Sequence, residues 1–278
     1  MNVIDLKYKA IEIRKLLLTT IYHGKTGHTG GSLSSADILT ALYYEVMKVD
    51  PKNPKWEGRD RFVLSKGHSV EGYYSILADK GFIDKEELDT FSQYGTRLIG
   101  HPNNKVPGVE VNTGALGHGL PVSVGMAIGL KKSNLSNRVF VLMGDGEQAE
   151  GSVWEAAMAA SHYKLDHLTA IIDRNHLQIS GSTEDVMSLE PLAKRWESFG
   201  WKVKEIDGND MEAVVNALKS APFEKDKPSL ILANTVKGKG VKEMENVIKW
   251  HHGVPNEALF QSAMEQFNQA EKELKANG

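Results

Sequence analysis

Val139-Phe-Val-Leu-Met-Gly-Asp-Gly146 decides the fold, because an unbroken apolar run passes directly into Gly-Asp-Gly. A second run, Leu168–Asp173, passes into Arg174-Asn175. Short apolar runs bounded by turn residues are typical of buried parallel strands. Between the two runs, Ser152–His162 has the length and composition of a helix. This strand–helix–strand order predicts a parallel sheet covered by helices.

The same alternation of strand-like and helical stretches continues along the chain. Further strands are expected at Arg61–Leu64, Lys202–Ile206 and Ser229–Thr235. In all but the first strand of the chain, apolar residues run together or nearly so, as they do in buried parallel strands. The other helices are expected near Asp5–Tyr22, Ser35–Met47, Glu71–Lys80, Val122–Lys132, Asp210–Ser220 and Glu257–Lys275.

The chain carries neither an internal repeat nor a linker long enough to separate domains. We therefore expect a single α/β domain over residues 1–278, with a mainly parallel central sheet flanked by helices and a C-terminal helix near residues 255–276. The longest stretch without predicted regular structure is Gly95–Gly119. A stretch of this kind inside a compact domain is more often functional than accidental.

Composition excludes several classes of function. The formal net charge of -3 provides no basic field for nucleic acid and no polybasic membrane patch. The absence of cysteine excludes disulfides, thiolate metal sites and cysteine nucleophiles. The charged segment Met1–Lys15 is not a secretory signal, and no apolar run approaches the ~20 residues that span a bilayer. We expect a cytoplasmic protein.

Asp145 and Asn175 follow two strands that are expected to be neighbours. The carboxyl ends of parallel strands are where α/β sheets bind ligands. Gly146 allows the backbone to approach a diphosphate closely, and the helix after it offers N–H groups to an anion. Oxygen ligands of this kind suit magnesium or calcium. By itself Gly-Asp-Gly is most often a tight turn and Asn175 a helix cap, and no Gly-x-Gly-x-x-Gly follows an expected strand to support a dinucleotide site.

The wider pattern resembles a known family. Gly-Asp-Gly followed by Asn, each closing an apolar strand, resembles the signature of thiamine-diphosphate enzymes. Several further segments resemble the N-terminal, diphosphate-binding domain of transketolase, in the family's order and over nearly the whole chain: Thr26-Gly27-His28-Thr29-Gly30-Gly31, Ser65-Lys66-Gly67-His68, Gly100-His101-Pro102, Thr113-Gly114-Ala115-Leu116-Gly117-His118-Gly119 and Trp250-His251-His252-Gly253. The resemblance implies a thiamin-diphosphate-binding fold that holds thiamine diphosphate with Mg²⁺, or with Ca²⁺ or Mn²⁺.

The resemblance also implies individual roles. Asp145, Asn175 and the main-chain carbonyl of Leu177 are expected to bind the metal. The cofactor-binding set that it implies is His68, Gly114, Leu116, Asp145, Gly146, Glu150, Asn175, Ile179 and His252. Glutamates at positions such as Glu150 and Glu155 belong, in the family, to a buried network at the subunit interface. Lys237 and Lys239 are interpreted as solvated, on a loop that two glycines leave flexible.

Four histidines in glycine-flanked loops form the expected catalytic set: His28, His68, His101 and His252. Transketolase cleaves a carbon–carbon bond beside a ketose carbonyl and passes a two-carbon ketol to an aldose. These steps move protons near neutral pH, which suits imidazole. A one-residue slip in the loop would make His251 the match in place of His252. His118 departs from the glutamine usual in the family, and it is left out of the set.

The resemblance implies a two-chain enzyme. In the family, a glutamate from a separate pyrimidine-binding domain activates the cofactor, and no motif in this chain resembles that domain. We therefore expect the partner to be a C-terminal transketolase subunit, with two chains of each kind and activity only in the complex. Sugar phosphates are the expected substrates, with those of the pentose phosphate pathway as the default. The alternatives are an α subunit of a 2-oxoacid dehydrogenase decarboxylase component, or a non-catalytic paralogue.

Overall fold

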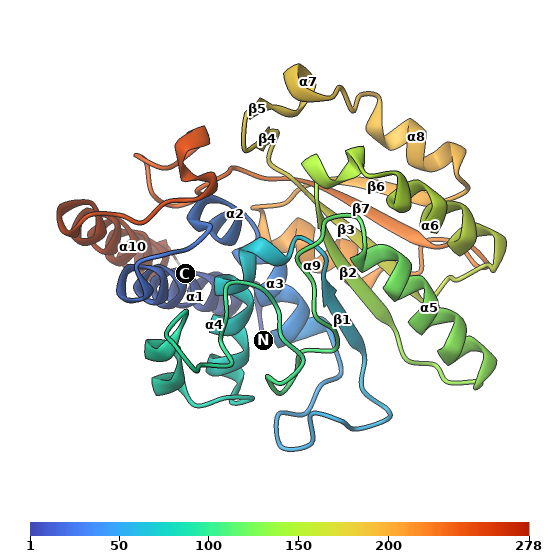
Figure 1. Cartoon of the computed structure of the whole chain (residues 1–278), viewed down its shortest axis with the longest axis horizontal. Coiled ribbons are helices and arrows are strands. Elements are labelled where there is room, and N and C mark those ends of the chain that lie inside the picture. Colours follow the sequence, from blue (N-terminus) through green and yellow to red (C-terminus); the bar gives the residue numbers. More distant parts are fainter. Residues whose placement is uncertain (278) are drawn as a thin grey trace.

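A computed structural model describes residues 1–277 and places all five predicted strands in one parallel sheet (Figure 1). Gly278, the last residue of the predicted domain, lies outside the described residues. The strand order is β1-β2-β3-β7-β6. The bounds are β1 Arg61–Leu64, β2 Val139–Gly144, β3 Leu168–Arg174, β7 Ser229–Asn234 and β6 Lys202–Asp207. The predicted fold class, an α/β domain with a parallel sheet flanked by helices, is confirmed.

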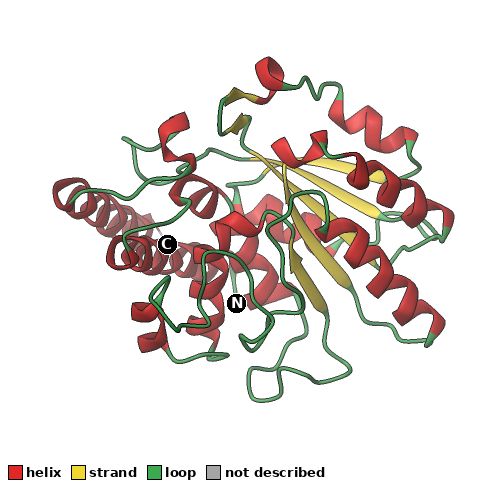
Figure 2. Cartoon of the chain, in the orientation of Figure 1, coloured by secondary structure: helices red, strands yellow, loops and turns green. Residues whose placement is uncertain are grey.

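Helices cover both faces of this sheet (Figure 2). Successive strand residues point to opposite faces, so Phe140 and Leu142 join one core while Val141 and Met143 join the other. The first core is shared with α1 (Val3–Gly24), α3 (Ala36–Ala41), α4 (Val70–Lys80) and α9 (Met211–Lys219). The second is shared with α5 (Gly119–Lys132), α6 (Gly151–His162) and α8 (Leu192–Ser198). The last helix, α10 (Glu257–Asn277), packs against α1.

The predicted burial of β6 is wrong. β6 is an edge strand, and most of its side chains are exposed or half-buried. Lys202, Lys204 and Glu205 place charges along it, as edge strands commonly do to avoid pairing with other chains. In contrast, every residue of the central strand β3 is buried. The apolar content of β6 is therefore too low to support a buried strand.

The helix predicted at Ser35–Met47 is divided, and a further helix precedes it. Within the predicted range lie α3 and a single π-helical segment, η1 (Leu42–Val46). The preceding helix, α2 (Thr29–Ser34), forms in a segment whose glycines predict a loop. Gly30 permits this close packing, because a Cβ there would lie 2.7 Å from the carbonyl oxygen of Trp250.

The remaining elements are short. The unpredicted hairpin of β4 (Leu177–Gln178) and β5 (Gly181–Ser182) leads into α7 (Thr183–Val186). The 3-10 turns are η2 (Gly67–Ser69), η3 (Lys85–Thr90), η4 (Gly146–Ala149) and η5 (Ile248–His251). As predicted, the long stretch that begins at Gly95 contains no helix or strand until α5. None of the helices within residues 1–277 combines the length and apolar character needed to cross a bilayer.

Candidate active site

A cavity of about 360 Å³ opens at the carboxyl ends of β2 and β3. The register places Gly144 of β2 beside Asp173 of β3, so the residues that follow the two strands emerge side by side. Asp145 and Asn175 line the cavity, and both are buried. The predicted pair therefore meets where parallel α/β sheets bind ligands.

The carboxylate of Asp145 is held by the backbone on both sides. Its Oδ1 accepts a hydrogen bond from the Gly146 amide at 2.8 Å, and its Oδ2 accepts one from the His176 amide at 2.6 Å. The Arg174 guanidinium also donates to Oδ2, at 3.4 Å. Burial raises the pKa of Asp145, the neighbouring charge of Asp173 raises it further, and Arg174 opposes both. The position of this oxygen pair is thus set by the chain and not by solvent.

Asn175 and Leu177 bring two more oxygens to the same wall of the cavity. Asn175 Oδ1 accepts from the Leu177 amide at 3.3 Å, and the Leu177 carbonyl accepts from Lys237 Nζ at 2.9 Å. Within residues 1–277, no three or more His, Cys, Asp or Glu side chains come together as a ready-made metal cage. One carboxylate, one amide and one carbonyl form an incomplete set of hard ligands. Such a set fits Mg²⁺ that takes its remaining ligands from phosphate oxygens and water.

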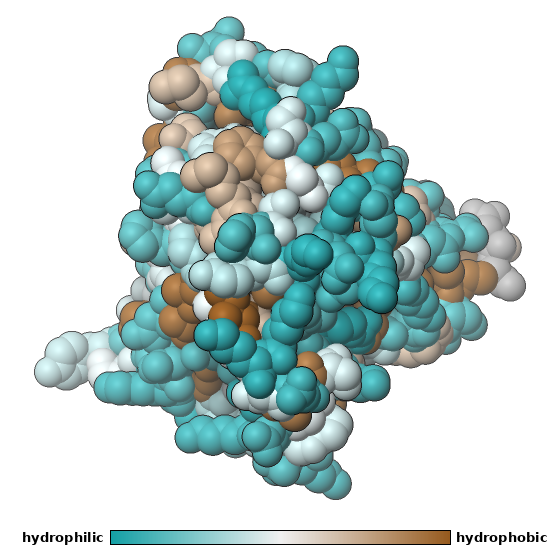
Figure 3. Space-filling model, turned by 90° about the vertical axis from the view of Figure 1, so that its right-hand side faces the viewer, coloured by the Kyte–Doolittle hydropathy of each residue, from teal (hydrophilic) through white to brown (hydrophobic). Residues whose placement is uncertain are grey.

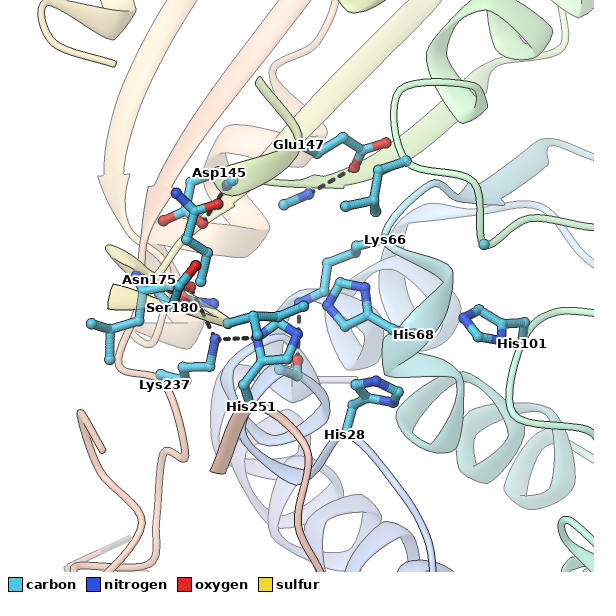
Figure 4. Close-up of a pocket in the computed structure, with 18 residues that line it drawn as sticks. His28, Lys66, His68, His101, Asp145, Glu147, Asn175, Ser180, Lys237 and His251 are labelled. Atoms are coloured by element: carbon cyan, nitrogen blue, oxygen red, sulfur yellow. Dashed lines mark hydrogen bonds between the residues drawn. The ribbon is translucent and has the colours of Figure 1, made fainter. Parts of the chain in front are cut away.

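Four histidine rings line the other side of the cavity, and the ring of a fifth, His252, lies beside His28. Measured from the His28 ring, the ring centroids of its neighbours lie at 4.7 Å (His252), 5.2 Å (His68), 5.7 Å (His251) and 6.3 Å (His101). Figure 4 shows His28, His68 and His101 facing Asp145 and Asn175, with His251 and Lys237 between the two groups. The rings come from segments far apart in the sequence. They lie just before α2, in η2, in the long loop after Gly95, and at the end of η5.

Burial favours the neutral form of four of these imidazoles by lowering the pKa of His28, His68, His101 and His251. It is the largest cause that lowers the pKa of His28 to about 4 and the pKa of His251 to about 3. It also lowers the pKa of His68 well below its ordinary value. Repulsion by Lys66 and Lys237 adds to each effect. A neutral imidazole has one N–H donor and one acceptor nitrogen, so it can both give and take a hydrogen bond from a hydroxyl group.

The sequence matches the profile of one family, "Transketolase, thiamine diphosphate binding domain", over residues 7–270. The chain belongs to the transketolase family. This assignment confirms the resemblance that the motifs indicated, and it favours transketolase over the α subunit of a decarboxylase component, which shares the Gly-Asp-Gly…Asn pattern.

Similar proteins include relatives that this chain covers almost completely and longer enzymes. A subunit of the apulose-4-phosphate transketolase of Phocaeicola vulgatus is 51% identical over 274 residues, which are 99% of this chain and 98% of the relative. The 6-deoxy-6-sulfo-D-fructose transketolase subunit SqwG of Clostridium sp. is 44% identical over 262 residues, 94% of this chain and 95% of the relative. The crystal structure of Campylobacter jejuni transketolase superposes with a TM-score of 0.88 at 33% identity, covering 99% of this chain. The chain spans about half, 48%, of that longer enzyme.

Most residues expected from the transketolase pattern line the cavity. Gly114, Leu116, Gly146 and Ile179 contribute to its wall, and Ile179 is 73% exposed. Gly114 has to be glycine, because its φ is +142° and a Cβ would lie 2.8 Å from His101 Cδ2. Glu150, by contrast, is not in the wall: it is exposed at the N-cap of α6.

Of the two adjacent histidines, His251 occupies the wall. His251 lines the cavity, and its Nδ1 lies 3.0 Å from Lys237 Nζ. His252 is exposed, and its Nε2 lies 3.4 Å from Thr26 Oγ1. In this structure His251 therefore lines the cavity, whereas His252, the residue predicted to lie between the diphosphate and the substrate, does not. His252 still contacts the cluster through its neighbour His28.

Three charged residues of the cavity wall do not appear in the set predicted from the sequence. Lys66 is buried, pairs with Asp173 and donates to the Gly31 carbonyl at 2.9 Å. Lys237 is only 2% exposed, so its predicted solvation is wrong, and burial lowers its pKa to about 8. The signal for Lys66 is its place beside His68 in the Ser-Lys-Gly-His motif, whereas the residues around Lys237 carry no comparable signal.

Glu147 is the third of these residues, although it directly follows Gly-Asp-Gly. Its carboxylate accepts from the Ser65 hydroxyl, from the Gly117 amide at 2.8 Å and from the Gly144 amide at 3.0 Å. It thereby joins three segments of the transketolase motif set: the end of β2, the Ser-Lys-Gly-His turn and the loop before α5. Glu147 organises the cavity, and no oxygen of its carboxylate is left without a donor.

Proposed function

We propose that this chain is the thiamine-diphosphate-binding subunit of a two-subunit transketolase. With its partner it transfers a two-carbon ketol unit from a ketose donor to an aldose acceptor. The observation that carries the proposal is the arrangement of the cavity, with hard oxygen ligands on one wall and four histidine rings on the other. Oxygen ligands suit a metal diphosphate, whereas neutral imidazoles suit a polyhydroxylated substrate.

The cofactor end of the cavity fits a metal-bound diphosphate. Asp145, Asn175 and the Leu177 carbonyl would hold Mg²⁺, and Lys237 already places a positive charge on that carbonyl. Lys66 adds a second buried ammonium group in the wall. Thiamine diphosphate, when bound, would supply the carbanion chemistry that cleaves a carbon–carbon bond next to a carbonyl.

The histidines perform the proton transfers in this proposal. His28 and His101 point toward the cavity from the side opposite Asp145 (Figure 4). Their rings are positioned to bind sugar hydroxyls and to take up or return a hydroxyl proton. A positioned general acid or base contributes about 10²–10⁴-fold to a rate. His68 and His251, closer to Lys66 and Lys237, are assigned to the diphosphate side.

We propose a partner subunit because the described cavity wall has no carboxylate that is free to activate the cofactor. Its two carboxylates, Asp145 and Glu147, are both engaged by backbone amides and side chains of this chain. The carboxylate that activates the cofactor would therefore come from a pyrimidine-binding domain on another chain. Relatives that match this chain over nearly their whole length are named transketolase subunits, which supports this division. We propose an assembly with two copies of each chain.

The names of the relatives also guide the proposed donor. One relative belongs to an apulose-4-phosphate transketolase and the other to a 6-deoxy-6-sulfo-D-fructose transketolase, so one name carries a phosphate and the other a sulfo group. We propose that the donor of this enzyme is a ketose with an anionic group distant from its carbonyl. The higher identity to the first relative favours a phosphate.

Co-purification with the partner subunit, followed by a donor screen, tests the proposal. The complex is assayed for ketol transfer with apulose 4-phosphate, 6-deoxy-6-sulfo-D-fructose and xylulose 5-phosphate as donors. We expect turnover with a phosphorylated ketose, and a loss of about 10²–10⁴-fold in turnover when His28 or His101 is changed to Ala. His162→Ala, at the end of α6 and outside the cavity, is the matched control. A complex that binds thiamine diphosphate but transfers no ketol unit from any donor would contradict the proposal.

A further inference from the structure

A buried glutamate lies behind the histidine cluster and takes no part in the functions described above. Glu71 is the second residue of α4, and its side chain is completely buried. It does not line the cavity. A carboxylate in such a place costs free energy unless hydrogen bonds satisfy it. The hydrogen-bond partners of Glu71 therefore indicate its role.

Both oxygens of Glu71 are bonded to the segment that carries His28. Oε1 accepts from the His28 amide at 2.9 Å, and Oε2 accepts from the Ser32 hydroxyl at 2.7 Å. His28 is the N-cap of α2, and Ser32 lies within that helix. The contact is tight: a Cβ at Gly27 would lie 2.8 Å from Glu71 Oε1. One carboxylate thus spans the start and the middle of α2.

Within residues 1–277, the hydrogen bonds of His28 are made by its backbone and not by its ring. Among the described residues, no hydrogen bond is formed by the His28 ring itself; its neighbours are the rings of His68, His101, His251 and His252. A second attachment comes from Thr29, whose hydroxyl donates to the Gly253 carbonyl at 2.6 Å. The His28 segment is therefore held on one side by Glu71 of α4 and on the other by the loop that carries His251.

We propose that Glu71 is a positioning residue that fixes His28 in the geometry needed for ketol transfer. The inference rests on the proposed function, since it assumes that His28 acts on the substrate. Misplacement of a reacting group by about 1 Å lowers a rate up to about 10²-fold. A buried carboxylate that bridges the His28 amide and Ser32 restricts such movement without touching the substrate.

Three substitutions separate positioning from simple stability. Glu71→Gln keeps the length of the side chain: its carbonyl accepts from the His28 amide, and its amide group donates to the Ser32 hydroxyl. Glu71→Asp keeps the carboxyl group but withdraws it from these two donors. Asp60→Asn is the matched control, because Asp60 is also a buried carboxylate that accepts from backbone amides, of Lys48 and Arg138, but it precedes β1 at the opposite end of the sheet.

Two measurements are made on the complex with the partner, and only one of them requires activity. Before cofactor is added, hydrogen exchange reports protection of the His28 amide. With cofactor, turnover is compared with the dissociation constant of thiamine diphosphate and Mg²⁺. We expect Glu71→Asp to speed exchange of the His28 amide at least tenfold and to lower turnover about 10–10²-fold, with cofactor affinity changed less than twofold. Glu71→Gln is expected to restore both values to near those of the wild type.

The outcomes decide between the two proposals. A protected His28 amide in Glu71→Asp, or a loss of turnover no larger than in Asp60→Asn, overturns the assignment of Glu71. If Glu71→Asp fails to fold, Ser32→Ala removes one of the two contacts and is judged by the same His28 exchange. A wild-type complex that lacks ketol transfer refutes the proposed function, whereas the exchange result still decides whether Glu71 fixes His28.

Discussion

Asp145 is the residue whose loss should cost the most cofactor affinity. It is the only carboxylate in the proposed metal shell, and it is buried. Changes to groups that merely support a metal ligand cost about 10–100-fold in affinity, so we expect Asp145→Ala to weaken Mg²⁺-dependent binding of thiamine diphosphate by more than about 100-fold. Titration calorimetry on the partnered complex, with and without Mg²⁺, measures this directly.

The control for Asp145 is an aspartate at the same edge of the sheet. Asp207 ends β6, and its Oδ1 accepts from the Asn209 amide at 2.8 Å, but it does not line the cavity. Asp207→Asn should bind the cofactor as the wild type does. Asp145→Asn keeps the size of the side chain and should still lose most of the affinity. Near-normal binding in Asp145→Asn would refute the assigned metal site.

The lowered pKa of Lys237 predicts that a proton is taken up when the cofactor binds. Burial, with repulsion from Lys66, lowers the pKa of Lys237 to about 8, so roughly half of these groups are neutral at pH 8. A diphosphate placed beside the ammonium group favours its charged form and raises this pKa. Binding at pH 8 should therefore take up about half a proton per site at Lys237, and less as the pH falls toward 6, where Lys237 is already protonated.

Calorimetry in buffers of different ionisation enthalpy counts these protons. Lys237→Met keeps the length of the side chain and should abolish the uptake at pH 8 while leaving any contribution of the cofactor itself. Lys239→Met, two residues away, is the matched control, since Lys239 does not line the cavity. Equal proton uptake by the wild type and Lys237→Met would show that Lys237 does not sense the diphosphate.

Single residues differ in how well the sequence predicts them. Asp145, Gly146, Asn175 and the histidines are predictable because each stands in a short motif of glycines and strand ends. Lys66, Lys237 and Glu71 act through partners far along the chain, such as the Asp173 that pairs with Lys66. A charged residue whose partner is distant in sequence looks like a solvated one, which explains the wrong prediction for Lys237.

At the scale of elements, Arg174 links the hairpin segment, residues 177–190, to Asp145 of the proposed metal site. Its side chain is buried at the end of β3 and donates to Asp145 at 3.4 Å, to Thr183 at 2.7 Å and to Glu190 at 2.8 Å. The segment contains only short elements, β4, β5 and α7. Its side chains Ile179, Val186 and Met187 are exposed, so they contribute little packing. The Arg174 guanidinium thus connects Asp145 in the cavity wall to the hairpin segment.

We expect Arg174→Met to loosen this segment. Limited proteolysis should cut within residues 177–190 at least several times faster than in the wild type. Cofactor affinity should fall about tenfold, the equivalent of one hydrogen bond to a charged group. Arg195→Met is the control, because Arg195 contacts the same segment from its exposed side, through the carbonyls of Ser188 and Glu190. Equal cleavage rates in the two variants would contradict the role of Arg174.

Elements are predicted well where the apolar pattern alone decides them. All five strands begin at the predicted residues. In β2, β3 and β7 short apolar runs bounded by turn residues mark the strand, whereas β6 has no such run and its predicted burial is wrong. α2 is not predicted, because glycines in this segment are typical of a loop. In the folded chain the helix packs against Lys237 and the Trp250 carbonyl, and only a glycine fits at position 30. β4 and β5 are too short to give any periodic signal.

At the scale of the whole molecule, the face of the sheet covered by α5 and α6 exposes apolar side chains to solvent. α5 and α6 lie side by side on one face of the sheet, and Val122 and Met158 on them are 37% and 54% exposed. A Cβ at Gly125 or Gly129 of α5 would meet nothing within 4 Å. Figure 3, which views this side of the molecule, shows apolar patches between hydrophilic regions. Exposed apolar patches mark protein interaction sites or self-association, so the isolated chain should self-associate.

The decisive prediction follows from the cavity and this surface together. Without its partner, the chain should show no ketol transfer at any concentration of thiamine diphosphate and Mg²⁺. In the described wall, Asp145 is held by Gly146 and His176, and Glu147 is held by Gly117 and Gly144, so neither carboxylate is available to activate the cofactor. Catalysis by proton transfer requires such a group within hydrogen-bond reach.

Adding the partner chain should restore activity, saturating near one partner chain per chain of this protein, because each cavity lacks one carboxylate. A coupled assay that titrates the partner at fixed cofactor measures the ratio, and light scattering on the same samples follows the loss of self-association. A partner variant with its activating glutamate changed to Gln is the matched control: it should bind and abolish self-association but restore little turnover. Robust ketol transfer by the chain alone, purified from a host without its own transketolase, would mean that the cavity is complete and that the two-subunit proposal is wrong.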